Sequence, residues 1–259
     1  MGPGNTDAAA HFVAKWHRRE PEMQFAELFC PAGQKPAFRV WGALLHELRE
    51  AMFELGDAGV KKAKTAWWAE EILGLDRGQA RHPLSETLVG IDAPWTALSR
   101  SMLEQDDLPI RAADTTSAIA ALLPLASAVV VAEAAVFRAA SSADAARSLA
   151  IHWLLQRVPI GLASEDRARI PMHLFARHGS DILQRDESSV QAMLRDWARE
   201  LDMAMPVSVG DAALIRRSRH QFDKIRLQRL GAGKGNSEPW PPATLWRARR
   251  IARTRGQLP

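Results

Sequence analysis

Apolar positions recur along most of this chain three and four residues apart, which is the spacing of one face of an α-helix. The clearest stretch covers residues 61–75, where Trp68, Glu71 and Leu75 share a face. The adjacent Trp67 points about 100° away from Trp68 around the helix axis. A helix with tryptophans in two directions packs on two sides, so we predict that this segment is a central helix of the core.

Prolines, capping residues and glycines divide the rest of the chain into further helices. Asp57 stands before the tryptophan helix as an N-cap, and Asp114 and Thr115 stand before a long apolar helix in the same role. The other predicted helices cover residues 11–19, 21–29, 36–55, 83–90, 94–107, 143–158, 171–178, 187–205, 209–230 and 240–253.

No segment shows the two-residue alternation of apolar and polar positions that predicts a strand. We therefore predict an all-α fold of about ten helices. Residues 1–20 are expected to form a flexible leader and a short helix. Residues 21–256 are expected to form one helical domain.

The composition is that of a globular protein with a sizeable core, with 47% apolar and 25% charged residues among 259. The single cysteine, Cys30, excludes an internal disulfide and fits a reducing compartment. The opening ten residues lack the basic and apolar regions of a signal peptide. The apolar run 118–137 contains Pro124 and Glu133, which favours a buried core helix over a membrane span. We therefore expect a cytoplasmic protein.

Basic residues are concentrated near the C-terminus. Residues 214–255 hold twelve Lys and Arg against Asp223 and Glu238, although the net charge of the whole chain is only +4. This distribution favours an anionic partner, of which a membrane surface, a nucleic acid and a diphosphate are the candidates. No recognised nucleic-acid motif is present, so no specific nucleic-acid partner is expected.

The helix predicted over residues 209–230 carries much of this charge. We expect its apolar side chains to pack on the body and its basic side chains to lie in solvent, where they can hold the protein peripherally on the inner membrane. These basic residues are Arg216, Arg217, Arg219, Lys224, Arg226 and Arg229.

Several common catalytic motifs are absent from the sequence. The glycine-rich residues 231–235 lack a phosphate loop's pattern, because Gln228 and Gly235 stand where that motif requires a glycine and a Ser or Thr. The histidines show no HExxH or other metal-binding spacing, and one cysteine cannot build a structural zinc site. No Gly-x-Ser-x-Gly segment exists for a hydrolase nucleophile.

A resemblance to a known family rests on the tryptophan helix and the segment after it. The pattern Lys-x-x-Trp-Trp-x-x-Glu over residues 64–71, followed by Arg-His-Pro at 81–83, resembles the squalene/phytoene synthase family. Weaker matches lie at residues 26–48, 164–179, 225–230 and 245–248, so the resemblance extends from about residue 21 to 250. It implies an isoprenoid-synthase-like bundle around a central apolar cavity. It also implies a head-to-head transfer of prenyl diphosphates, with Mg²⁺ held between two aspartate-rich helices.

The first aspartate-rich motif of the family, close to Arg-x-x-Asp-Asp-x-x-Asp, falls on residues 46–54 here. Its aspartates are replaced by Arg49, Glu50 and Phe53, with Glu47 and Glu54 nearby. Mg²⁺ prefers oxygen ligands, which arginine and phenylalanine cannot supply.

The second motif, Asn-x-x-Arg-Asp-x-x-x-Asp, falls on residues 154–162. It keeps Arg157, but Leu154, Val158 and Leu162 replace the asparagine and both aspartates. With neither motif complete, we expect no metal site and no cofactor. Mg²⁺ is expected only if unusual ligands serve an active enzyme.

The site residues implied by the resemblance come from these two alignments. The candidates for catalysis are Glu47, Glu50, Glu54 and Arg157, and the candidates for ligand binding are Arg49, Phe53, Trp68, Arg157, Val158 and Arg169.

Four hypotheses about function remain open at this point, and the last of them is a basic nucleic-acid-binding module, which only the C-terminal charge favours. The first is a family member with a degenerate Mg²⁺–diphosphate site that binds an isoprenoid or other lipid chain, or acts as partner of an active synthase. The second is a working prenyltransferase in which Glu47, Glu50 and Glu54 replace the aspartates. The third is a non-enzymatic assembly or scaffold protein.

Overall fold

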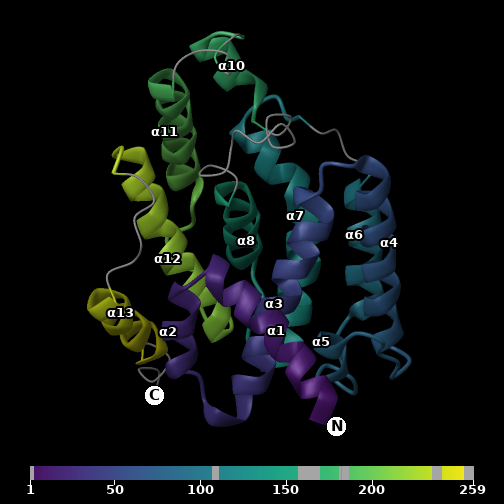
Figure 1. The fold of residues 1–259 in the computed structure, drawn as a ribbon. Coiled ribbons are helices and arrows are strands. Elements are labelled where there is room, and N and C mark those ends of the chain that lie inside the picture. The colour runs from purple at the N-terminus through teal and green to yellow at the C-terminus, as the bar shows by residue number, and fades with distance from the viewer. Residues whose placement is uncertain are drawn as a thin grey trace.

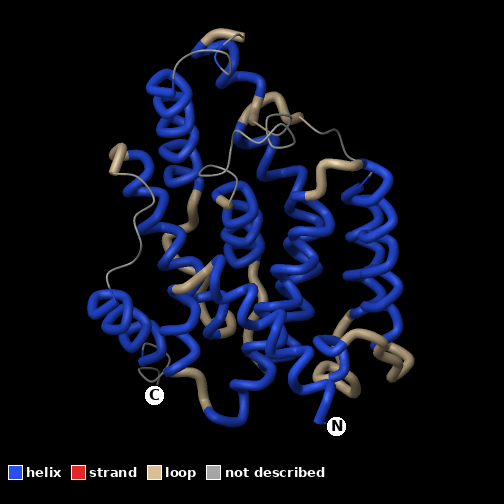
Figure 2. Tube along the Cα trace, viewed as in Figure 1, coloured by secondary structure: helices blue, strands red, loops and turns tan. Residues whose placement is uncertain are grey.

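The structure is a computed structural model that describes residues 3–106, 111–156, 170–180, 182, 187–234 and 241–253. Its described residues form twelve α-helices and no strand (Figures 1 and 2), which confirms the predicted all-α fold. The helices are α1 (Pro3–Arg19), α2 (Glu22–Leu28), α3 (Lys35–Arg49), α4 (Ala58–Leu75), α5 (Pro83–Glu86), α6 (Trp95–Asp106), α7 (Thr115–Phe137), α8 (Ala143–Leu155), α10 (Met172–His178), α11 (Glu187–Ala204), α12 (Leu214–Gly231) and α13 (Pro241–Arg253).

The helices are arranged around α3, α7 and α8, which lie in the middle of the bundle (Figure 1). On one side α6 packs on α7, and α4 packs on α6. On the other side α12 packs on α8, and α11 packs on α12. The N-terminal α1 crosses α3 on the near face in Figure 1, and α2 packs on α12 and α13. The C-terminal helix α13 therefore packs on the N-terminal part of the chain through α2.

Predicted caps account for where two of the long helices begin. The Asp57 side chain accepts a hydrogen bond of 2.8 Å from the backbone N–H of Val60, which starts α4. The Asp114 side chain accepts one of 2.7 Å from the backbone N–H of Ser117, which starts α7. Pro124 lies inside α7, as expected.

Several helix boundaries differ from those predicted, and the helix expected over residues 83–90 ends at Glu86. The helix expected from residue 11 begins at Pro3, so most of the leader that was expected to be flexible belongs to α1. The helix expected from residue 209 begins only at Leu214. The helix expected to run to residue 55 changes at Glu50 into a π-helical turn, Glu50–Glu54. A π-turn changes the direction of the side chains beyond it and is often found at functional sites.

The tryptophan helix α4 lies at the side of the bundle and packs mainly against α6. Trp68 is 5% exposed and belongs to the core, whereas Trp67 is 39% exposed. The prediction of a central helix buried on two sides was therefore wrong for Trp67, because α4 has a neighbour on only part of its circumference.

Helix α7 is, by length and composition, long and apolar enough to cross a membrane, and it is the single such helix among the described residues. In the most apolar stretch of 18 residues within this helix, 44% of the residues are buried inside the protein. It packs between α6 and α8 and carries Glu133, which is 2% exposed. These contacts agree with the core helix expected from the sequence.

Candidate functional site

The residues aligned with the family's first motif lie where α3 passes into its π-helical turn. Arg49 and Phe53 are buried, at 3% and 5% exposure, whereas Glu50 is partly exposed. The Phe53 ring packs against Trp153 of α8, with ring centroids 5.6 Å apart. The π-helical turn aligned with the first motif thus contacts α8 through aromatic side chains, at the residue just before the segment aligned with the second motif.

Arg49 is held by carboxylates from two directions. Its Nε lies 3.0 Å from Glu54 Oε1, and its Nη1 lies 3.7 Å from Glu20 Oε1. His46, one turn earlier on α3, contacts the Arg49 Nη2 through Nδ1 at 3.0 Å. The guanidinium therefore occupies the interior position at which the family would carry an aspartate.

Glu20, between α1 and α2, is the centre of a buried charge network. Both Nε and Nη2 of Arg219 donate to its Oε2, at 3.0 and 2.7 Å. His152 Nε2 lies 3.8 Å from Glu20, and its Nδ1 lies 2.9 Å from Asp223 Oδ2. Burial opposes ionisation of Glu20, but the charge of Arg219, its hydrogen bonds to Glu20 and the charge of Arg49 outweigh it and hold its pKa well below the usual range. Burial lowers the pKa of His152, so its imidazole is neutral near pH 7.

A second buried group joins α3, α7 and α12. Arg216 donates from Nε and Nη2 to the two oxygens of Glu133, at 3.1 and 2.8 Å. Trp41 Nε1 also donates to Glu133, at 2.8 Å. Arg216 and Arg219 are 1% and 3% exposed. The prediction that the basic side chains of this helix lie in solvent was therefore wrong for these two arginines, because each has a buried carboxylate partner.

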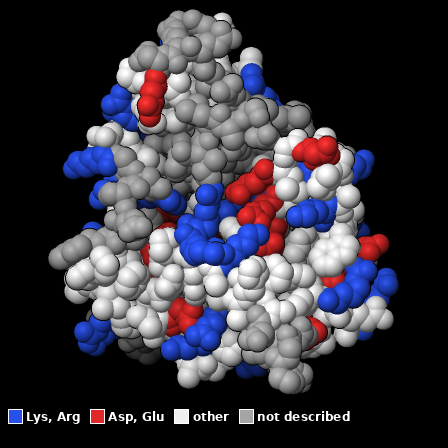
Figure 3. All heavy atoms as spheres, in the orientation of Figure 1, with Lys and Arg blue, Asp and Glu red and all other residues white. Residues whose placement is uncertain are grey.

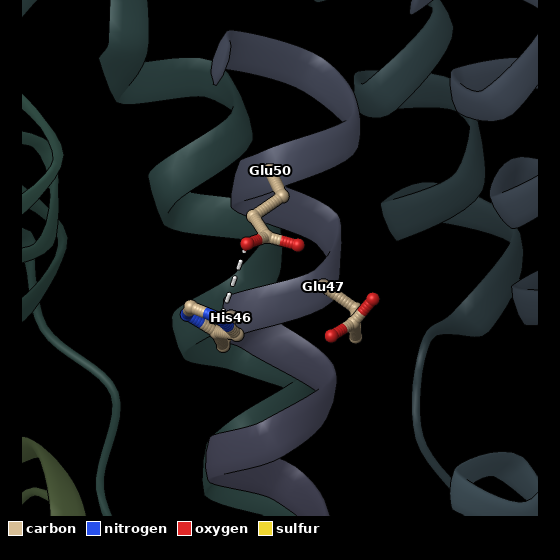
Figure 4. Close-up of side chains that lie close together, drawn as sticks. All are labelled: His46, Glu47 and Glu50. Carbon is tan, nitrogen blue, oxygen red and sulfur yellow. Dashed lines mark ion pairs between the residues drawn. The ribbon is translucent and has the colours of Figure 1, made fainter. Parts of the chain in front are cut away.

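Where α1 crosses the end of α3 and its π-helical turn, a lysine, a histidine and two carboxylates lie close together. His46 and Glu47 project from the end of α3 and Glu50 from the π-helical turn that follows (Figure 4), and one ligand atom from each lies within 4.8 Å of the others. His46 Nε2 lies 3.4 Å from Glu50 Oε1. Figure 3 shows basic side chains beside acidic ones near the middle of this face.

Lys15 of α1 lies between the two carboxylates of this cluster. Its Nζ donates to Glu47 Oε1 at 2.8 Å and also to Glu50 Oε2. Burial raises the pKa of Glu50, but hydrogen bonds from His46 and Lys15 outweigh it and lower the pKa to about 2. An ammonium group thus stands where a metal ion shared by these ligands would have to bind.

The residues that carry the family resemblance form a structural connection between α4 and α5. Glu71 accepts hydrogen bonds from the backbone N–H groups of Arg81 and His82, at 2.8 and 2.9 Å, and from Arg81 Nε at 3.1 Å. Trp68 packs on the His82 ring at 4.7 Å, and Arg81 lies over Trp67 at 5.6 Å. The expected ligand-binding residue Trp68 therefore packs within this connection.

The structure brings some of the predicted site residues together and leaves others undescribed. Arg49, Glu47, Glu50, Phe53 and Glu54 gather at the end of α3. Arg157, Val158 and Arg169 lie outside the described residues. Sequence reasoning missed the partners of this group, namely Lys15, Glu20, His152, Arg219 and Asp223. The local sequence signal for these partners was His152, a single histidine among the apolar residues of α8.

Comparison with solved structures places this architecture in a known class. The chain is similar to a dehydrosqualene synthase, seen in a crystal structure in complex with a ligand, with a TM-score of 0.66. The similarity covers 98% of this chain and 99% of that chain, at 10% sequence identity. No family model and no curated protein sequence matches the chain.

The protein thus has an all-α fold of the isoprenoid-synthase type. More particularly, the fold is squalene/phytoene synthase-like. An identity this low relates the two proteins through their fold and does not transfer an activity.

Proposed function

We propose that this protein binds an isoprenoid or other lipid chain, or partners an active synthase, and does not catalyse metal-dependent transfer of a prenyl diphosphate. The proposal treats the chain as a degenerate member of the squalene/phytoene synthase type. One observation carries it: the carboxylates nearest the first motif are already paired with cations of the protein itself.

These pairs involve every glutamate that could replace the missing aspartates. Glu47 and Glu50 are paired with Lys15, and Glu54 is paired with Arg49. A metal–diphosphate site needs carboxylate oxygens that are free to coordinate Mg²⁺. Arg49 also adds a positive charge close to where the metal would bind, which opposes cation binding. This donor set does not fit the Mg²⁺ that the fold family implies.

The lipid part of the proposal is supported by the fold and by the apolar side chains near the motif positions. Phe53 and Leu154 stand at positions where the family would carry polar motif residues, and both are buried, with Phe53 packed on Trp153 of α8. Apolar side chains at these positions favour contact with a hydrocarbon chain over contact with a charged headgroup.

A working prenyltransferase is the second candidate, favoured by the geometry of His46, Glu47 and Glu50. Their ligand atoms are close enough to converge on one ion after a small movement. This function requires Lys15 to leave the two carboxylates when a metal binds.

Calorimetry separates the two candidates. Mg²⁺ is titrated into the protein in the presence of a non-hydrolysable farnesyl diphosphate analogue, and the analogue is titrated without Mg²⁺ as the control. We expect no metal-dependent heat, because Lys15 and Arg49 already neutralise the available carboxylates. Tight binding that requires both Mg²⁺ and the analogue would instead establish the active-enzyme candidate.

Chain binding is measured independently with dansyl-labelled farnesol, which carries no diphosphate. Energy transfer from the protein's tryptophans to the dansyl group is expected to saturate, and unlabelled farnesol is expected to displace the probe. The matched control is a dansyl amide without the chain. If the two dansyl compounds bind equally, the lipid-binding part of the proposal is wrong.

A further inference from the structure

The last helix, α13, exposes an unusual combination of residues for the surface of a bundle. It contains no acidic residue, and its arginines at 247, 249, 250 and 253 are all exposed. Trp246 is 61% exposed and lies on the side away from the buried Ala248 and Ile251, and the neighbouring Leu245 is 39% exposed. Exposed tryptophan next to several arginines is typical of helices that lie in a membrane interface.

A pocket of about 540 Å³ opens beside these residues, between α13, α12 and the turn at residues 208–211. Arg217, Arg247 and Arg250 contribute positive charge to its wall, and Asp211 is its one acidic lining residue. The Arg217 Nη1 donates to the backbone oxygen of Ile251 at 2.8 Å, which holds this guanidinium near the C-terminal end of α13. The pocket is therefore a cationic recess of the size of a small-ligand site.

Trp246 connects the pocket with the outer face of α13. Trp246 is one of the lining residues, and the Arg250 guanidinium lies 5.7 Å from the centroid of its ring. An anionic group that enters the recess would meet arginine, while the attached apolar part would meet Trp246 and Leu245. An anionic lipid in a bilayer combines these two chemistries, since its phosphate lies just above its acyl chains.

We propose that α13 and the adjacent pocket form a docking surface for an anionic phospholipid bilayer, with a headgroup phosphate in the Arg217–Arg247–Arg250 recess and Trp246 at the level of the acyl chains. The membrane contact expected for the basic face of α12 is thus assigned to α13 instead, because Arg216 and Arg219 of α12 are buried in ion pairs. The inference is independent of the proposed function, because it concerns a different face of the bundle.

Vesicle co-sedimentation of the full chain tests the proposal. The protein is expected to sediment with vesicles of phosphatidylcholine mixed with phosphatidylserine, and not with phosphatidylcholine alone. Binding should be lost at about 0.5 M salt, where charges are screened within about 4 Å. Sedimentation with neither kind of vesicle, or equally with both, would overturn the proposal.

Matched double variants locate the surface. Arg247→Gln with Arg250→Gln should reduce partitioning into anionic vesicles about 30-fold, because each substitution removes one electrostatic attraction between the protein and the anionic headgroups. Arg77→Gln with Arg100→Gln removes the same charge from exposed positions near α4 and α6 and should leave partitioning unchanged. An equal reduction by both pairs would show attraction by net charge alone and would overturn the proposal.

A third variant tests contact with the hydrocarbon region. Phosphatidylcholine brominated on its acyl chains, mixed with phosphatidylserine, should quench part of the tryptophan fluorescence of the wild-type protein. Trp246→Ala should lose that quenching. Quenching that is unchanged in Trp246→Ala, or displacement of the protein from vesicles by inorganic phosphate at low millimolar concentration, would contradict docking through this residue on a bilayer.

Discussion

Lys15 is the residue whose replacement most directly tests whether the protein supplies its own cation to the first-motif region. Lys15→Met keeps the apolar stem but removes the charge that neutralises Glu47 and Glu50. The lysine side chain is 33% exposed, so solvent weakens both ion pairs. Each is therefore worth about 0.5–1 kcal/mol, and the variant should lose about 1–2 kcal/mol of stability at pH 7. The melting temperature should fall by about 2–8 °C.

The loss should depend on pH in a defined direction. The folded-state pKa of Glu50 is about 2, below its ordinary value of 4.5, so its contribution is present above pH 4.5 and disappears as the pH falls towards 2. The gap in unfolding free energy between wild type and Lys15→Met should therefore narrow through this window. Urea denaturation at a series of pH values measures it, with Lys62→Met as the control at an exposed position on α4.

Removing the lysine should also make the carboxylates available to a metal. Mn²⁺ at 100 times its dissociation constant would stabilise Lys15→Met by about 2.7 kcal/mol, and it should not stabilise the wild-type protein. A variant as stable as the wild type at pH 7, or one that Mn²⁺ does not stabilise, would refute the view that Lys15 takes the place of a metal ion.

Three further predictions concern the packing that supports the site. Glu20→Gln leaves Arg219 buried without its counter-charge, so urea denaturation should show a loss of about 3–5 kcal/mol in the free energy of unfolding. A loss under about 1 kcal/mol would contradict the view that Arg219 depends on Glu20 for its charge compensation. Trp68→Ala should cost about 3–5 kcal/mol and the more exposed Trp67→Ala about 1 kcal/mol, and equal melting temperatures would contradict the difference in burial between the two side chains. Gly42→Ala places a methyl group against an aromatic ring of α1 and should cost about 1–3 kcal/mol, which thermal unfolding would detect as a lower melting temperature.

Local sequence signals were enough to predict the fold class and the start of several helices. Asp57 and Asp114 cap α4 and α7 because an N-cap needs only a short polar side chain and the next few backbone N–H groups. The α-helical spacing of apolar residues is equally local, and it excluded a sheet. The pattern around the two tryptophans indicated the bundle type that the structural comparison supports.

The candidate site was predicted only in part, because its chemistry depends on partners distant in sequence. The alignment identified Arg49, Glu50 and Phe53 as departures from the aspartate-rich motif. It gave no sign that Lys15 would lie between Glu47 and Glu50, because that contact requires α1 to cross α3.

The same limit explains the incorrect prediction for α12. In the sequence, Arg216 and Arg219 belong to a basic helix that resembles a solvated face. In the fold, Arg219 meets Glu20 across 199 positions of sequence, and Arg216 meets Glu133 across 83. Periodicity and capping determined where helices form, because those interactions act within a few residues. Tertiary packing alone decided which charges are buried, because a buried arginine is stable only where the fold supplies its carboxylate.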